Sequence, residues 1–342
     1  MLQFVHILLL SLHLICMNVG SGAPLLCAWL EWKLRNDKTS SEGAARQAAD
    51  YLAAMTVLAL VAGSLLGLVM GIMLWTPEYS AVWTKRLSHK MHWGGAELLV
   101  SLGVLGGYWF WRKRSRGGSM ASAICRIFLL LFASTNLLYH FPPLFFVAGK
   151  LADGKDAGGR AVQGRVFVQE MLSGEIPALW VHFTLASLAM AGVMLLGLAL
   201  RLRRKGAPEE EAARVAIWGG WWGLVPSILQ LPVGLWVMTA LPAASQSRIM
   251  GSSGVATVFF LAGIVAALWL LRELVSIALG ETSRGNLIRA MSAMVLVVFL
   301  MTGTHQCAKD GAEDTLKSMM TAQKNPREPS SRVSEFLAQK ER

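Results

Sequence analysis

Apolar residues in this chain form eight long stretches, and short polar or basic segments separate them. Crossing a bilayer takes roughly 20 predominantly apolar residues in a helix, because lipid offers an open backbone no hydrogen-bond partner. The stretches cover residues 3–32, 51–76, 92–111, 123–148, 176–200, 215–241, 254–279 and 286–306. We therefore predict an all-α integral membrane protein whose eight transmembrane helices form two four-helix halves.

The eight stretches divide the chain into four parts. Residues 1–150 hold the first membrane half, 151–174 an outer loop, 175–306 the second membrane half and 307–342 a polar C-terminal tail. The first stretch lacks the basic start of a signal peptide, so we expect it to be retained as a helix. A weak internal repeat favours the two halves, since the fourth and eighth stretches each begin near an arginine, Arg126 and Arg289, and carry a histidine further on.

The composition excludes a soluble enzyme. Of the 342 residues, 54% are hydrophobic and 15% are charged, whereas soluble domains carry roughly 25% charged residues. The formal net charge is +11, and 17 Lys and Arg residues follow odd-numbered stretches while 8 follow even-numbered ones. Because short cytoplasmic loops collect basic residues, both termini should lie outside, in the periplasm of a bacterial inner membrane protein. The same loops suit anionic lipid, so we expect lipid contacts and no nucleic acid partner.

Few ionisable residues fall inside the predicted spans, where charged groups are costly and usually serve a function. By helical rise, His13, Glu97, His140 and His182 lie roughly 8 to 15 Å below the outer boundary of the membrane. His305 falls at the end of the last stretch. These residues therefore predict a polar layer in the outer half of the membrane.

A layer of neutral imidazoles among apolar side chains is what a b-type haem needs. We predict one or two haems b, bound by His13, His140, His182 and His305, with His13 and His182 ligating the haem iron. If the halves repeat, His13 should face His140 and His182 should face His305. The alternative for each histidine is a hydrogen-bonded packing role. The four cysteines form no CxxC pair, which excludes a zinc ribbon and covalently attached haem c.

The role of Glu97 in this layer has two interpretations, and two prolines affect the backbone beside His140. Glu97 could be catalytic, transferring protons from within the membrane, or could only cap the helix that starts near residue 92. Pro142 and Pro143 follow His140 closely and predict a bend in the backbone beside it.

Segments of the first five stretches resemble subunit I of the cytochrome bd-type oxidases, over about residues 2–205. The resemblance rests on Leu2-Gln3-Phe4 and the histidine after it, Ala62-Gly63-Ser64-Leu65-Leu66-Gly67, Ala96-Glu97-Leu98, Ser134-Thr135-Asn136 and Trp180-Val181-His182-Phe183-Thr184-Leu185-Ala186-Ser187. It implies that His13 is the haem ligand of the first helix, Glu97 the carboxylate at the oxygen-side haem, and His182 an axial ligand of the low-spin haem b.

The chain also departs from that family. A short connection, residues 242–254, replaces the family's long outer quinol-binding loop, and the ninth helix and axial methionine have no clear counterpart. We therefore expect a haem b-containing membrane electron-transfer subunit that passes electrons between a quinone pool and an outer-side redox partner such as a cytochrome c. Whether it is itself an oxidoreductase stays open. The alternative is a non-redox scaffold or transporter subunit on the same helical frame, without haem.

Overall fold

The computed structural model describes residues 2–36, 42–114, 119–153 and 159–324, and every regular element within them is a helix. The long helices are α1 (Leu2–Asn36), α2 (Glu42–Met73), α4 (Ser88–Arg114), α5 (Met120–Tyr139), α8 (Ile176–Arg204), α9 (Glu209–Ala240), α11 (Gly254–Ala278) and α12 (Arg284–Lys324). The shorter ones are α3 (Pro77–Ala81), η1 (Val82–Arg86), α6 (Phe141–Asp153), α7 (Gly164–Met171), α10 (Ala243–Ser247) and η2 (Arg248–Ser252), of which η1 and η2 are π-helical.

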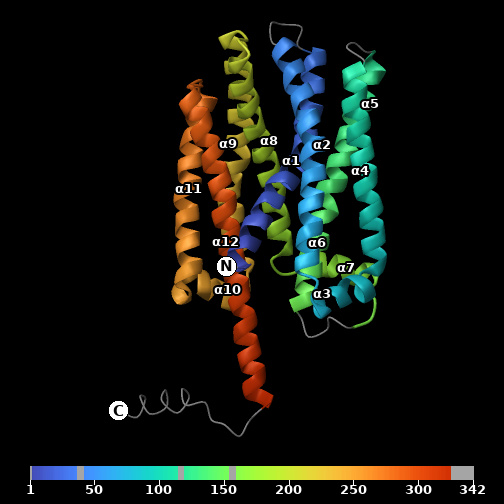
Figure 1. Cartoon of the computed structure of the whole chain (residues 1–342), viewed down its shortest axis with the longest axis vertical. Helices are drawn as coiled ribbons and strands as arrows, with labels where there is room; N and C mark the ends of the chain where they lie inside the picture. The colour runs from blue at the N-terminus through green and yellow to red at the C-terminus, as the bar shows by residue number, and fades with distance from the viewer. Residues whose placement is uncertain (1, 37–41, 115–118, 154–158, 325–342) are drawn as a thin grey trace.

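The long helices run side by side in one bundle (Figure 1). Helix α1 packs against α2, α5 and α8, and α4 lies against α2 and α5. Helix α8 packs against α9 and α12, and α11 lies against the same two helices. The contact between α1 and α8 therefore joins the helices of the first half of the chain to those of the second.

Glycines allow the central helices to approach closely. A Cβ atom on Gly22 of α1 would lie 2.1 Å from the main-chain oxygen of Ser187 on α8. On the other side of α8, a Cβ atom on Gly192 would lie 2.4 Å from the main-chain nitrogen of Gly223 on α9. Backbone-to-backbone packing through small residues is the usual way in which membrane helices gain close contact without a hydrophobic driving force.

Seven helices of the described chain are long and apolar enough to cross a membrane: α1, α2, the α5–α6 pair, α8, α9, α11 and α12 up to Lys309. This is an integral membrane architecture, and the long helices overlap the predicted stretches, whereas α3, η1, α7, α10 and η2 lie between them. Helix α4 is the exception to the hydropathy criterion, because even its central part is only weakly apolar: it contains Glu97, five glycines and the polar-edged rings of Tyr108, Trp109 and Trp111.

The outer faces of the helices carry apolar side chains, as expected next to lipid. On α11, the exposed positions recur every three or four residues, which is one face of a helix. They are Val255, Val258, Leu261, Val265 and Leu268, each between 56% and 68% exposed.

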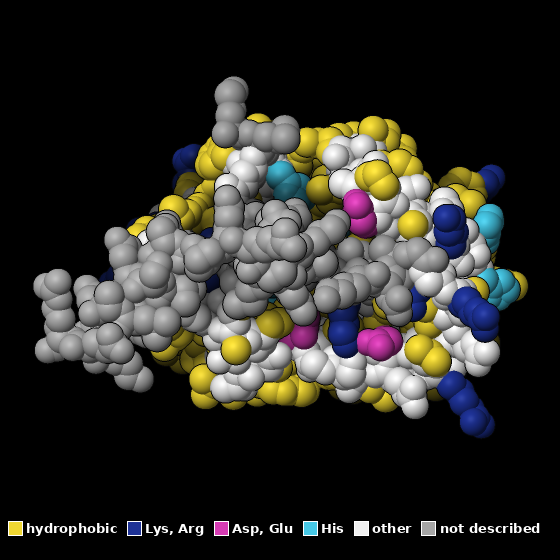
Figure 2. Space-filling model, turned by 90° about the horizontal axis from the view of Figure 1, so that it is seen from below, with side chains coloured by type: hydrophobic (Ala, Val, Ile, Leu, Met, Phe, Trp, Pro, Cys, Tyr) yellow, Lys and Arg dark blue, Asp and Glu magenta, His cyan; other side chains and the backbone are white. Residues whose placement is uncertain are grey.

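The two ends of the bundle differ. We call the end where α1, α4, α8 and α11 finish the basic end, and it lies at the top of Figure 1. The short helices α3, η1, α7, α10 and η2 lie at the opposite end, where charged and histidine side chains appear among apolar ones (Figure 2). The predicted outer loop contains α7, whose Phe167 and Met171 are buried in a small core with Trp83 of η1.

Candidate functional site

The imidazole of His13 is held against α2. Its Nδ1 lies 2.8 Å from the main-chain oxygen of Gly63, and because a carbonyl oxygen only accepts, Nδ1 carries the proton. The ring lies over Gly67, where a Cβ atom would come within 2.9 Å of the ring carbon Cε1. In neutral His13, Nε2 therefore keeps its lone pair. This is the form in which a histidine binds a metal, with the other ring nitrogen bonded to a main-chain oxygen.

Glu97 of α4 and His140, the residue between α5 and α6, form a pair. Nδ1 of His140 lies 2.9 Å from Oε2 of Glu97, and the two side chains are 45% and 30% exposed. Asn136 fastens α5 to α4 beside them, since its Nδ2 donates to the Glu97 main-chain oxygen at 3.1 Å and to Oγ of Ser101 at 2.7 Å. The pair can share a proton, and it has the carboxylate–imidazole arrangement that orients metal-bound histidines.

The structure settles one alternative for Glu97. Helix α4 begins at Ser88 and has no acidic residue in its first turn, so Glu97 lies more than two turns inside it. Glu97 is therefore no N-terminal cap. The helix is interrupted at His140, where the bend was predicted, because α5 ends at Tyr139 and α6 starts at Phe141.

His182 of α8 has a buried ring nitrogen, Nδ1, for which the described part of the chain offers no hydrogen-bond partner. Its main-chain oxygen accepts a hydrogen bond of 3.4 Å from Nε2 of Gln230 on α9. Two residues earlier, Nε1 of Trp180 donates to the main-chain oxygen of Leu138 at 2.7 Å and ties α8 to α5. An unsatisfied nitrogen in a buried imidazole is costly, so His182 has an unused donor or acceptor available for a ligand.

His305 lies half-buried on α12, next to the buried Thr304. The contacts of His13 run to α2 and those of His140 run to α4. The hydrogen bonds of these two histidines thus reach neighbouring helices rather than each other, and the pairings of His13 with His140 and of His182 with His305 stay predictions. Within the described residues, no three His, Cys, Asp or Glu side chains gather as a metal site, but a haem iron takes only one or two protein ligands.

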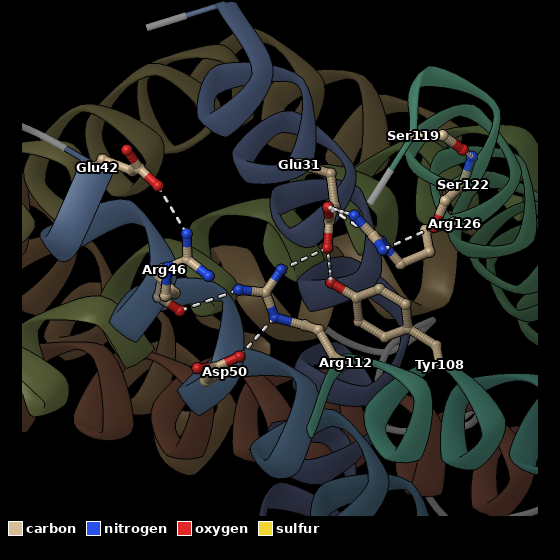
Figure 3. A network of polar contacts seen from close by, with 9 residues as sticks. All are labelled: Glu31, Glu42, Arg46, Asp50, Tyr108, Arg112, Ser119, Ser122 and Arg126. Atoms are coloured by element: carbon tan, nitrogen blue, oxygen red, sulfur yellow. Dashed lines mark hydrogen bonds and ion pairs between the residues drawn. The ribbon is translucent and has the colours of Figure 1, made fainter. Parts of the chain in front are cut away.

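A second polar group, at the basic end, did not follow from the sequence. We call Glu31, Asp50, Tyr108, Arg112 and Arg126, which come from α1, α2, α4 and α5, the Glu31 cluster; they are among the residues drawn in Figure 3. Oε1 of Glu31 accepts hydrogen bonds from Nη1 of Arg112 and, at 3.0 Å, from the hydroxyl of Tyr108. Nε and Nη2 of Arg126 donate to Oε2 at 3.2 and 3.0 Å. Nε of Arg112 also binds Asp50 at 2.6 Å.

The sequence presented Arg112 and Arg126 only as basic residues near the ends of predicted spans. Both are buried in the structure. The available signal was an acidic residue, Glu31, at the end of one apolar stretch with arginines at the ends of two others, but sequence spacing does not show which span ends meet. A similar contact occurs in the second half, where Nε of Arg289 lies 3.1 Å from Oε2 of the buried Glu273.

Comparison with known proteins shows what the helical arrangement resembles. Neither a protein family nor a curated protein matches this chain by sequence. Among solved structures, the fold is similar to that of a chain in the structure of bd oxidase from Geobacillus thermodenitrificans, with a TM-score of 0.70 and 13% sequence identity. The match covers 89% of this chain and 84% of that chain. At this identity, the likeness shows a bd oxidase-like fold and nothing of ligands or activity.

Proposed function

We propose that this chain is a haem b-containing membrane electron-transfer subunit related to the bd-type oxidases. The observation that carries the proposal is the geometry of His13, whose Nδ1 donates to Gly63 on another helix and whose Nε2 thereby keeps a lone pair for iron. The bd oxidase-like fold supports it, because the match covers 89% of this chain. A bound haem b would supply one-electron transfer.

The other residues of the layer fit such a group. His182 brings a ring nitrogen, Nδ1, that is buried and has no hydrogen-bond partner among the described residues. His140 has its Nδ1 engaged by Glu97, which leaves its Nε2 as the atom that faces a ligand. Glu97 would fix the orientation of the His140 ring and accept or release a proton at Oε2. His305 is proposed as a further ligand from α12.

The arrangement of helices supports the proposed membrane frame. We place eight spans in the membrane, in a half formed by α1, α2, α4 and α5 and a half formed by α8, α9, α11 and α12. In each half the first helix packs on the second and the fourth, and the third helix packs on the same two. Arg126 of α5 and Arg289 of α12 each bind a buried glutamate near the basic end. With the basic end in the cytoplasm, both termini would lie outside.

The proposed partners are a quinone pool and an outer-side redox protein such as a cytochrome c. They follow from the depth of the histidine layer, which would place a haem closer to the outer surface than to the basic end. The polar C-terminal segment would help to dock the redox protein. Helix α12 continues to Lys324, and the rest of this segment lies outside the described residues.

A reduced-minus-oxidised absorption spectrum of the purified full chain tests the proposal. We expect a b-type signal, and we expect His13→Ala to remove or shift it. His92→Ala is the matched control, because His92 is exposed and its Nδ1 bonds only to the Ser88 oxygen of its own helix among the contacts described. A folded protein with no haem signal would overturn the proposal and leave the non-redox scaffold.

A further inference from the structure

A cavity of about 220 Å³ opens at the basic end between the last turn of α8 and the first turn of α12. Its lining consists of Leu200, Arg203, Arg204 and Arg284. Three arginines around one small cavity would repel one another unless acidic groups neutralise them or an anion binds between them. The partners of each arginine therefore decide what this cavity does.

Arg203 has its partners within the chain. Its Nε and Nη2 donate to the carboxylate of Glu209 at 3.1 and 2.5 Å. Its Nη1 and Nη2 donate to the main-chain oxygen and hydroxyl of Thr282 at 2.5 and 3.1 Å. Arg203 is thus neutralised by Glu209 and joins the end of α8 to the connection between α11 and α12. It forms a fixed wall of the cavity.

Arg204 and Arg284 are different. Both are exposed, and the described residues give neither guanidinium an ion pair or a hydrogen bond. They therefore bring two positive charges, free of any described acidic partner, to one cavity. A guanidinium binds phosphate oxygens through two parallel hydrogen bonds, and arginine is the side chain favoured for that geometry.

The position of the cavity indicates where the phosphate comes from. The apolar segment of α8 ends at Arg204 and that of α12 begins at Arg284, so both arginines lie at the edge of candidate membrane spans. Leu200 lies one helical turn deeper and lines the same cavity. A phospholipid places its phosphate at this level and its acyl chains alongside the apolar segment below. Basic pockets between membrane helices are suited to anionic headgroups.

We propose that Arg204 and Arg284 form a binding site for a phosphate group, occupied by the headgroup of an anionic phospholipid at the basic end of the bundle. Arg203 positions the site through Glu209 and Thr282. The site shares no residue with the histidine layer, so the test of the lipid site does not depend on the proposed haem function.

Native mass spectrometry of the full chain in a neutral detergent tests this site. The protein is titrated with dioleoylphosphatidylglycerol, dioleoylphosphatidylcholine or sodium phosphate at constant ionic strength. We expect the first phosphatidylglycerol to bind more tightly than phosphatidylcholine, and the double variant R204Q/R284Q to weaken that binding about tenfold or more. The control is R114Q/R272Q, which removes the same charge from two exposed arginines of α4 and α11. It should bind as the unmodified chain does.

Titration with the three ligands distinguishes the possible outcomes. Selective phosphatidylglycerol binding that is lost in R204Q/R284Q and kept in R114Q/R272Q supports the site. Equal binding by both double variants overturns it, because the attraction would then come from net charge alone. Saturable binding of sodium phosphate without any preference for phosphatidylglycerol overturns the lipid assignment and leaves a site for free phosphate.

Discussion

Glu31 and Glu97 are both carboxylates between long helices of one bundle, yet their surroundings differ. Glu31 is 2% exposed and receives hydrogen bonds from two arginines and a tyrosine on two other helices. Glu97 is 30% exposed and meets one described partner, His140, which is itself 45% exposed. The first carboxylate has its hydrogen-bonding capacity used within the chain, whereas the second has capacity left over.

This difference separates structure from function in the polar residues of the bundle. A buried charge that is fully paired cannot take a ligand without losing a partner, and removal of that partner is expensive. An imidazole or carboxylate with an unused atom can bind iron or move a proton at little cost to the fold. We therefore propose that the Glu31 cluster serves stability and that the layer of His13, Glu97, His140 and His182 serves function.

The largest effect is expected from Glu31→Gln. The substitution removes the charge that faces two buried arginines, Arg112 and Arg126, and should destabilise the protein by about 3–5 kcal/mol. Thermal unfolding in detergent, followed by tryptophan fluorescence, measures it. Glu42→Gln is the control, because Glu42 and Arg46 form an exposed pair with side chains 48% and 41% exposed, and such a pair contributes about 0.5 kcal/mol. Equal stability of the two variants would contradict a structural role for the Glu31 cluster.

A smaller loss is expected from Tyr108→Phe. The Tyr108 side chain is among the largest that are fully buried, and its hydroxyl donates to Oε1 of Glu31 at 3.0 Å. Loss of one hydrogen bond to a charged acceptor should cost about 1.5–3 kcal/mol, while the packing of the ring is kept. In the Glu31→Gln background the same substitution should cost clearly less, because the charged acceptor is already gone. Additive losses in this double-mutant cycle would show that the hydroxyl and the carboxylate do not interact.

The smallest change in stability is expected from Glu97→Gln, together with a clear change in function. Because the Glu97–His140 pair is partly exposed, its loss should cost less than about 1 kcal/mol. Unlike the carboxylate, the amide cannot take up a proton, so the pH dependence of the midpoint potential of a bound haem should weaken. A potentiometric titration at several pH values measures this. A large loss of stability with an unchanged pH dependence of the midpoint potential would show that Glu97, like Glu31, has a structural role.

The sequence predicted the long helices well because their signal is local. Helices α8 and α11 begin at Ile176 and Gly254, where apolar runs begin. The break beside His140 also followed from local chemistry, since Pro142 and Pro143 cannot donate to the preceding turn. The Glu31 cluster did not follow, because Arg112 lies 81 residues from Glu31 in the chain. Pairing across that distance depends on which helices become neighbours, and apolar periodicity does not contain this information.

The sequence indicated which residue types form the candidate site, but not their contacts. Histidines at similar depths in separate spans predicted the layer. Their partners could not be predicted, because Gly63 contributes only a main-chain oxygen to His13. The pairing of Glu97 with His140 likewise depends on the place where α4 meets the end of α5.

The most direct test of the haem assignment is the haem content of the full chain, measured by pyridine extraction in the unmodified protein and in His182→Ala. We predict one or two haems b per chain in the unmodified protein and the loss of a low-spin b-type haem in the variant, with Glu31→Asp as a control that perturbs the fold without touching the layer. A monodisperse, folded protein that contains no haem, or a His182→Ala variant with unchanged haem content and spectrum, would contradict the assignment of His182 as a ligand.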